Sequence, residues 1–266
     1  MTGRMRVVVA VAIGVMGFAA QAQGQITGMP LFTNPRYGTG LRVHADIGQP
    51  ADSGVQPGKL SVVQVGATLA IGSLGIGING AIPKSKLSSL SACTSSTPLL
   101  NNCDPTTKFT GSALAQLRVV GGGLNPLALS IFGGVSADFG AYDVGVNSSL
   151  PVAQIPLAQR VVDSLKTKEL TIPVGAALGI HIPLGFLSVN LWGAPRYNLH
   201  KFTNCGTTNA AQCSGKMTGT FRWAAGADIP LLGILGVRAA YDSGKIGNRT
   251  VNYWGVGVSV GFGGMR

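Results

Sequence analysis

The sequence predicts an all-β fold, a ten-stranded antiparallel up-and-down transmembrane β-barrel with short periplasmic turns and long extracellular loops. Three observations predict it. Apolar residues alternate with small or polar residues along ten segments, the number of segments is even, and their connections alternate between tight turns and long polar loops. A barrel whose strands face lipid on one side and a lumen on the other has these features.

The composition agrees with this class and excludes several others. Glycine accounts for 40 of 266 residues, charged residues are 11% and apolar residues are 45%. A soluble domain carries about 25% charged residues, and a disordered chain is less apolar than this one. The glycines follow no three-residue period, which excludes collagen.

The first residues predict a cleaved secretory signal over 1–22. Arg4 and Arg6 precede an apolar stretch that is too short to span a bilayer, and Ala20 to Ala22 form a small-residue cleavage motif. A retained anchor helix is the alternative. We expect export by the Sec route to the outer membrane of a Gram-negative-type bacterium, a periplasmic segment over 23–36, and a barrel domain over 37–266.

The apolar run at 60–83 shows why strands are predicted rather than a membrane helix. Its apolar residues recur with period two, and a Gly72-Ser73 turn divides it into a hairpin. A soluble β-sandwich is the alternative fold. The same alternation predicts strands at 39–48, 59–71, 74–82, 108–120, 126–139, 168–182, 186–199, 216–229, 234–243 and 250–262.

Residues 155–168 break the alternation. Leu157, Val161 and Leu165 are spaced as on one face of a helix, with Pro156 near its start. They predict either a short amphipathic helix, in or over the barrel mouth, or an ordinary ordered loop.

Four cysteines lie in two polar loops and suit an oxidising compartment. Local pairing closes short loops, so we expect disulfides between Cys93 and Cys103 and between Cys205 and Cys213. The spacing and the lack of histidines between the members of either pair make a zinc site a poor alternative. No metal site is expected.

The last strand carries a resemblance. Large side chains at Trp254, Val256, Val258, Val260 and Phe262 alternate with small ones. With the hairpin repeat, this pattern resembles the small outer-membrane β-barrel proteins of Gram-negative bacteria, the opacity-type and OmpW-like group. The resemblance implies that these five residues form the signal read by the barrel-assembly machinery, although four residues follow Phe262 here.

Charged side chains in the polar phase of the strands are expected in the lumen. The tight turn at 230–233 places Arg222 near Asp242 and Arg238 near Asp228 on facing strands. The full predicted set is Arg42, Asp46, Arg118, Asp138, Arg196, Arg222, Asp228, Arg238 and Asp242.

The lysines gather in or beside the long loops. They either form a solvated surface or contact lipid A phosphates, for which outer-membrane lipid and lipopolysaccharide would be the partners. The net charge of +11 does not predict nucleic-acid binding, because an exported chain without an aromatic and basic patch is unsuited to it. Aromatic residues near the loop ends of the strands predict an interface girdle. The candidate phosphate contacts are Lys84, Lys86, Lys108, Lys201 and Lys216. The candidate girdle residues are Phe109, Phe139, Tyr197, Phe221, Tyr241 and Trp254.

No catalytic residue or cofactor is expected. The glycine motif at 75–80 lies within a strand, which is the wrong context for a dinucleotide site. Outer-membrane proteases of the omptin kind carry an adjacent Asp-His pair, which this chain lacks. An enzyme here would need a rim acid within hydrogen-bond reach of His200. His44 and His181 are expected to be lumen residues.

The inward positions are rich in glycine, alanine and serine, which predicts an unfilled lumen. The leading hypothesis is a narrow passive channel for small polar solutes or ions. The alternative is a non-conducting structural or surface-interaction barrel whose disulfide-clipped loops bind a partner, and a rim hydrolase is the third. The sequence leaves the solute and the oligomeric state open.

Overall fold

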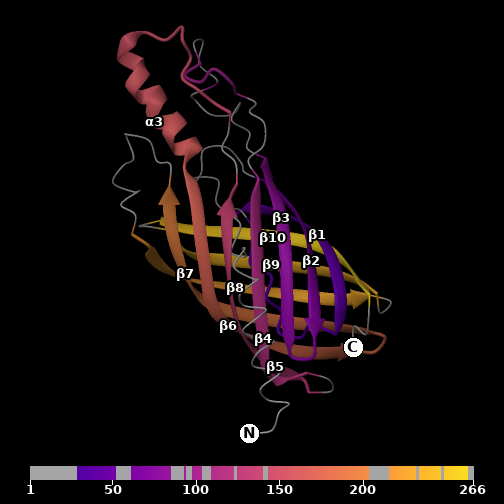
Figure 1. Cartoon of the computed structure of the whole chain (residues 1–266). Coiled ribbons are helices and arrows are strands. Elements are labelled where there is room, and N and C mark those ends of the chain that lie inside the picture. Colours follow the sequence, from indigo (N-terminus) through magenta and orange to yellow (C-terminus); the bar gives the residue numbers. More distant parts are fainter. Residues whose placement is uncertain are drawn as a thin grey trace.

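The computed structural model describes residues 29–51, 61–84, 93, 98–103, 109–122, 125–139, 143–203, 216–231, 234–246 and 249–262. Ten antiparallel strands form a closed barrel in which each strand pairs with its neighbours in sequence (Figure 1). The first and last strands close the cylinder, from Leu41 opposite Phe262 to Pro50 opposite Tyr253. Every strand therefore has two partners, and the sheet has no open edge to leave unpaired in lipid.

All ten predicted strands are confirmed, with ends that shift by a few residues. β6 and β7 are the longest because their pairing continues from Leu184 opposite Leu187 to Lys168 opposite Thr203. The strands are β1 Gly40–Pro50, β2 Ser61–Ile71, β3 Leu74–Lys84, β4 Thr110–Gly121, β5 Leu127–Asp138, β6 Lys168–Leu184, β7 Leu187–Thr203, β8 Thr218–Leu231, β9 Leu235–Ile246 and β10 Arg249–Phe262.

The two ends of the barrel differ. Short connections join β2 to β3, β4 to β5, β6 to β7 and β8 to β9 at one end, which we call the turn end. Gly72 and Gly185 adopt φ values of 60° and 68° in two of these turns, a conformation that suits glycine. The other connections leave the opposite end, which we call the loop end. They are long except the one from β9 to β10, which spans only residues 247–248 and is shorter than the sequence predicts.

The 155–168 segment forms a helix. A 3₁₀ turn, η2, spans Val152–Gln154, and α3 follows at Ile155–Lys166, with a proline in its first turn. Figure 1 shows α3 continuing from β6 beyond the strands at the loop end, standing away from the barrel instead of folding into its mouth. Within the described residues, no helix has the length and apolar character needed to cross a membrane.

Candidate functional site

Residues 29–39, which we call the lumen segment, run inside the barrel. At the loop end, Met29 is fully buried against Val62 and Ala81. At the turn end, the Tyr37 hydroxyl donates to the carbonyl of Ser73 and lies 3.0 Å from the carbonyl of Gln116. The segment then turns at Gly40 into β1. We expected residues 23–36 in the periplasm, and residues 29–36 lie inside the barrel instead.

Polar side chains of the barrel wall hold this segment by its backbone. The Gln116 amide NH₂ lies 3.3 Å from the carbonyl oxygens of both Thr33 and Asn34. The Arg118 guanidinium donates to the carbonyl of Tyr37 at 3.0 Å, and the backbone N–H of Leu31 donates to Asp242 at 3.4 Å. These bonds supply partners for backbone groups that have no strand to pair with.

Three inward glycines make room for the lumen segment. A Cβ added at Gly179 would lie 2.7 Å from Cγ of Pro35, one at Gly255 would lie 2.9 Å from Cδ of Pro30, and one at Gly75 would lie 3.2 Å from the Tyr37 ring. The prediction of an unfilled lumen is therefore wrong along the lumen segment. The glycines do widen the lumen, but part of the chain occupies the added space.

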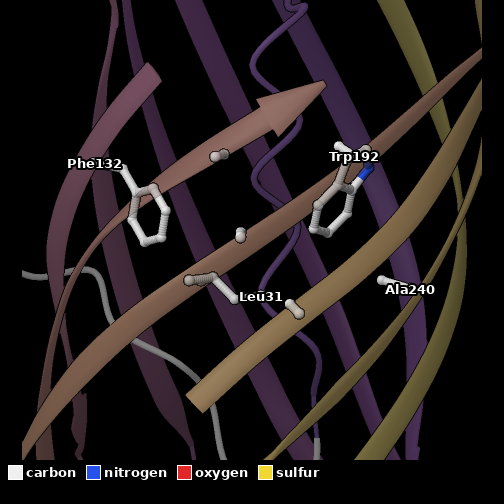
Figure 2. Packing of buried hydrophobic residues seen from close by; sticks show 7 residues of the cluster. Leu31, Phe132, Trp192 and Ala240 are labelled. Atoms are coloured by element: carbon white, nitrogen blue, oxygen red, sulfur yellow. The ribbon is translucent and has the colours of Figure 1, made fainter. Parts of the chain in front are cut away.

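Side chains close the lumen at mid-height. Leu31 of the lumen segment packs with Phe132 of β5 and Trp192 of β7, and small residues of β6 to β9 complete the cluster (Figure 2). Phe132 and Trp192 are each 4% exposed, so the cluster is a packed hydrophobic core and does not line an open constriction. The cluster contains Leu31, Phe132, Ala177, Trp192, Ala194, Ala224 and Ala240.

Two buried charge clusters lie on the inner wall. In the first, Asp242 accepts from Arg222 at 2.8 Å and from Arg196 at 2.5 Å, and all three side chains are 0% exposed. The predicted approach of Arg222 to Asp242 is thus observed. Arg196 joins them from β7, a contact that the hairpin alone does not reveal.

The second cluster confirms the predicted approach of Arg238 to Asp228 and adds a partner. Arg238 faces Asp228 in the strand register, and its guanidinium donates to both oxygens of Asp46, which it reaches over Gly257 of the intervening strand β10. His44 lies 2.9 Å from Asp46, and the Phe32 ring lies 4.2 Å from the Arg238 guanidinium carbon. This cation–π contact ties the lumen segment to the wall.

The remaining predicted lumen charges also lie on the inner wall. Asp228 accepts from the Trp192 indole N–H at 2.9 Å, and Asp138 accepts from the Glu169 backbone N–H at 2.9 Å. Arg42 and Asp228 both line a cavity of about 100 Å³ at the turn end, between the lumen segment and the wall.

The outer rim of the lumen brings together a constellation that the sequence did not reveal. The Nδ1 atom of His200 lies 2.7 Å from the Glu169 carboxylate, and its Nε2 atom lies 3.0 Å from Oγ1 of Thr220. Thr171 donates to the same carboxylate at 2.9 Å. The condition set for an enzyme, a rim acid within reach of His200, is therefore met by Glu169.

The other histidines sit among lumen polar groups. His181 lies 2.8 Å from the Asn190 side-chain oxygen, and His44 belongs to the Asp46 cluster. Among the described residues, no group of three or more histidine, cysteine or acidic side chains is arranged to hold a metal ion.

A second core lies beyond the loop end. It is formed by Cys93, residues 98–103 and residues 143–166, which include α3, and we call this unit the outer module. Leu100, Val144 and Val162 are buried together, with the cysteines beside them. The predicted Cys93–Cys103 disulfide is confirmed, and Leu100 pairs with Val146 in an isolated antiparallel bridge. Cys205 and Cys213 lie outside the described residues.

The outer surface of the barrel carries large apolar side chains on all ten strands. In β10, Trp254, Val256 and Val258 are exposed while Gly255 and Gly257 are buried. Exposed apolar surface of this extent is costly in water and favourable in lipid. The structure is that of a membrane-spanning β-barrel.

Comparisons with solved structures find other barrels of this kind. Neisserial surface protein A is 12% identical, with 84% of this chain and 98% of that chain covered and a TM-score of 0.32. The β domain of the Bordetella autotransporter BrkA is 11% identical, covering 84% and 99%, with a TM-score of 0.44. The outer-membrane protease OmpT from Escherichia coli is 9% identical, covering 89% and 100%, with a TM-score of 0.36.

No protein-family model and no curated protein matches the chain. At these identities, the similarity concerns barrel architecture alone.

The predicted girdle aromatics all lie on the exposed outer surface of the barrel. Their exposed fractions run from 38% for Tyr241 to 61% for Phe221. Trp223, which the sequence reading missed, joins them and lies 5.8 Å from Tyr241 between ring centroids. Aromatic side chains at this level suit a membrane interface.

The predicted phosphate contacts are described only in part. Lys201 is half-buried near the end of β7, and Lys216 is exposed just before β8. The side chains of Lys84, Lys86 and Lys108 lie outside the described residues. The predicted assembly-signal residues face outward from β10, with Phe262 62% exposed at the turn end.

Proposed function

We propose that this outer-membrane protein is a plugged, non-conducting barrel that presents the outer module at the cell surface to bind a partner. The observation that carries the proposal is the occupied lumen. Residues 29–39 fill the bore, Leu31 packs between Phe132 and Trp192, and the nearby charges are bound to one another. This arrangement favours the surface-interaction hypothesis over the channel.

The outer module has the features of a binding element. Its disulfide and small core restrain the loops, which lowers the entropy lost on binding. The C-terminal end of α3 leads into β6, so its N-terminal end is the one that points away from the barrel (Figure 1). At or just before this N-terminal end, Val152 is 82% exposed, Leu157 55% and Ile155 40%. Exposed apolar side chains at the tip, with Arg160 exposed beside them, suit a partner that offers apolar and acidic groups, such as an anionic lipid surface.

Two membrane partners remain part of the proposal. Lys201 and Lys216 would contact lipid A phosphates at the loop end, and the exposed side chains of β10 would be read by the barrel-assembly machinery. Both rest on position: the lysines lie near the ends of β7 and β8, and the β10 side chains face outward.

Two measurements test the proposed function. In planar bilayers, the purified protein should give no conductance steps, and regular steps would contradict the plugged lumen. Cells displaying the protein should attach to supported bilayers containing anionic lipid, and replacing Val152, Ile155 and Leu157 by serine should remove the attachment.

The matched control for attachment is Phe186→Ser, which removes a 96% exposed side chain from a short turn at the opposite end. It should leave attachment unchanged. Equal attachment by the triple variant and the parent protein would contradict the role of the outer module.

A further inference from the structure

We infer that Thr220, His200 and Glu169 form a hydrolytic site for carboxylic esters at the outer rim. The inference is independent of the proposed surface binding. Three adjacent strands supply the residues: β6 carries Glu169, β7 carries His200 and β8 carries Thr220. All three belong to the inward phase of these strands, near the loop end.

The distances match the order of groups needed to activate a hydroxyl. The Glu169 carboxylate, 2.7 Å from Nδ1, holds the imidazole of His200 in the tautomer that leaves Nε2 without a proton. Nε2 then accepts the hydroxyl of Thr220 at 3.0 Å. A nucleophile, a base and an orienting carboxylate in this sequence are the arrangement used for acyl transfer on unrelated folds.

Burial separates the roles of the three groups. His200 is 3% exposed, which keeps its orientation fixed, while Thr220 is half-buried and keeps some exposed surface. The side chain of Glu169 is 17% exposed, and Thr171 donates to it at 2.9 Å. Asn198 lies opposite Thr220 in the register and presents a carboxamide on the same face.

The height of the site gives it access to water. β7 runs from the short turn at Phe186 to His200 over about 14 residues, which at ~3.3 Å per residue and a tilt of ~40° is roughly 35 Å. The apolar band of such barrels is about 25 Å tall. The site therefore lies at the outer edge of this band, beside the interface aromatics Tyr197 and Phe221.

The reaction balances without a cofactor. His200 takes the Thr220 proton as the hydroxyl oxygen attacks the ester carbonyl, and it gives that proton to the departing alkoxide, which leaves as an alcohol. The acyl group is then bonded to Thr220. Water attacks this acyl-threonine while His200 again accepts and returns one proton, which releases the carboxylic acid and restores the hydroxyl. Glu169 is a positioning residue, because it acts through His200.

The test measures hydrolysis of p-nitrophenyl acetate and p-nitrophenyl palmitate by the full barrel in lipid vesicles. Faster turnover of the acetate indicates a soluble ester, and faster turnover of the palmitate indicates a membrane ester. Thr220→Val and His200→Asn should each lower kcat/KM by about 100-fold or more. Thr220→Ser should retain activity, because it keeps the hydroxyl.

Glu169→Gln should lower kcat by about 10-fold or more and leave KM unchanged. Disruption of the site would change KM as well, so this pair of values separates a positioning role from a structural one. The control is Thr68→Val, which removes an inward threonine hydroxyl near the turn end. Trapped protein should carry one acetyl group on the peptide containing Thr220. Absence of hydrolysis above buffer by the parent barrel, or equal rates for Thr220→Val in a folded barrel, would overturn the inference.

Discussion

A buried cluster of charged and polar side chains lies at the middle of the lumen and another at its outer rim, and the two differ in exposure. At mid-height, Asp242 is fully buried between Arg196 and Arg222, and the lumen segment lies against it. At the rim, His200 is equally buried, but the hydroxyl that it contacts belongs to a half-buried Thr220. The first cluster has no route to a ligand and holds the structure together. The second includes a hydroxyl-bearing residue that keeps some exposed surface.

Removing the lumen segment should have the largest effect. The barrel closes through β1 and β10 without it, so a protein lacking residues 29–38 should still fold. It should give conductance steps in planar bilayers, because Leu31 and the side chains around Tyr37 no longer fill the bore. The triple serine variant of the outer module is the control and should stay silent. A folded but silent deletion variant would show that the wall alone closes the lumen.

Asp242→Asn should be the most destabilising of the point substitutions. It leaves Arg196 and Arg222 buried without their carboxylate, at a cost of about 3–5 kcal/mol in the free energy of unfolding. Urea unfolding in lipid vesicles measures it. The control is Asp143→Asn at an exposed position beyond the loop end, with an expected change within about 0.5 kcal/mol. Equal losses for both variants would contradict a stabilising role for the buried Asp242 cluster.

Gly179→Val should have an intermediate effect. The new side chain would meet Pro35 at 2.7 Å from its first atom, so the lumen segment must shift, at a cost of about 1–3 kcal/mol. The control is Gly193→Val on the neighbouring strand, where nothing lies within 4 Å of an added Cβ. Unfolding of the two variants under the same conditions tests whether the glycine is needed for the segment.

Thr220→Val should have the smallest effect on stability. Thr220 is half-buried and its hydroxyl makes a bond to His200, so we expect a loss of about 1 kcal/mol or less. The same variant should lose ester hydrolysis, so stability and chemistry separate at the rim. A loss of stability as large as that of Asp242→Asn would make the rim cluster a structural network.

The sequence predicts the strands of the barrel wall better than the residues that fill the lumen. Alternation reveals ten strands because one face must meet lipid, and the short β8–β9 turn brings Arg222 to Asp242. The lumen segment has no such signal, since Pro30 and Pro35 prevent a ladder and its position depends on the closed barrel. Because the position of the lumen segment cannot be predicted from the sequence, the inward glycines are interpreted there as a sign of an unfilled lumen.

Contacts between distant residues explain the other differences. Glu169 and His200 are 31 residues apart, and the β6–β7 register decides whether they meet. Arg238 faces Asp228 in its own hairpin, as predicted, but its guanidinium binds Asp46, 192 residues away. Both contacts depend on the register between strands, which the sequence pattern leaves undetermined.

The most direct test of the occupied lumen is a crosslink between the segment and the wall. A protein with Pro35→Cys and Gly179→Cys should form a disulfide in intact cells, because an added Cβ at 179 lies 2.7 Å from Cγ of Pro35. Mass spectrometry should find the two peptides linked, and each single variant controls for the native cysteines. Linkage in most molecules is the predicted result. Two free, reactive thiols in a folded barrel would contradict a lumen filled by residues 29–39.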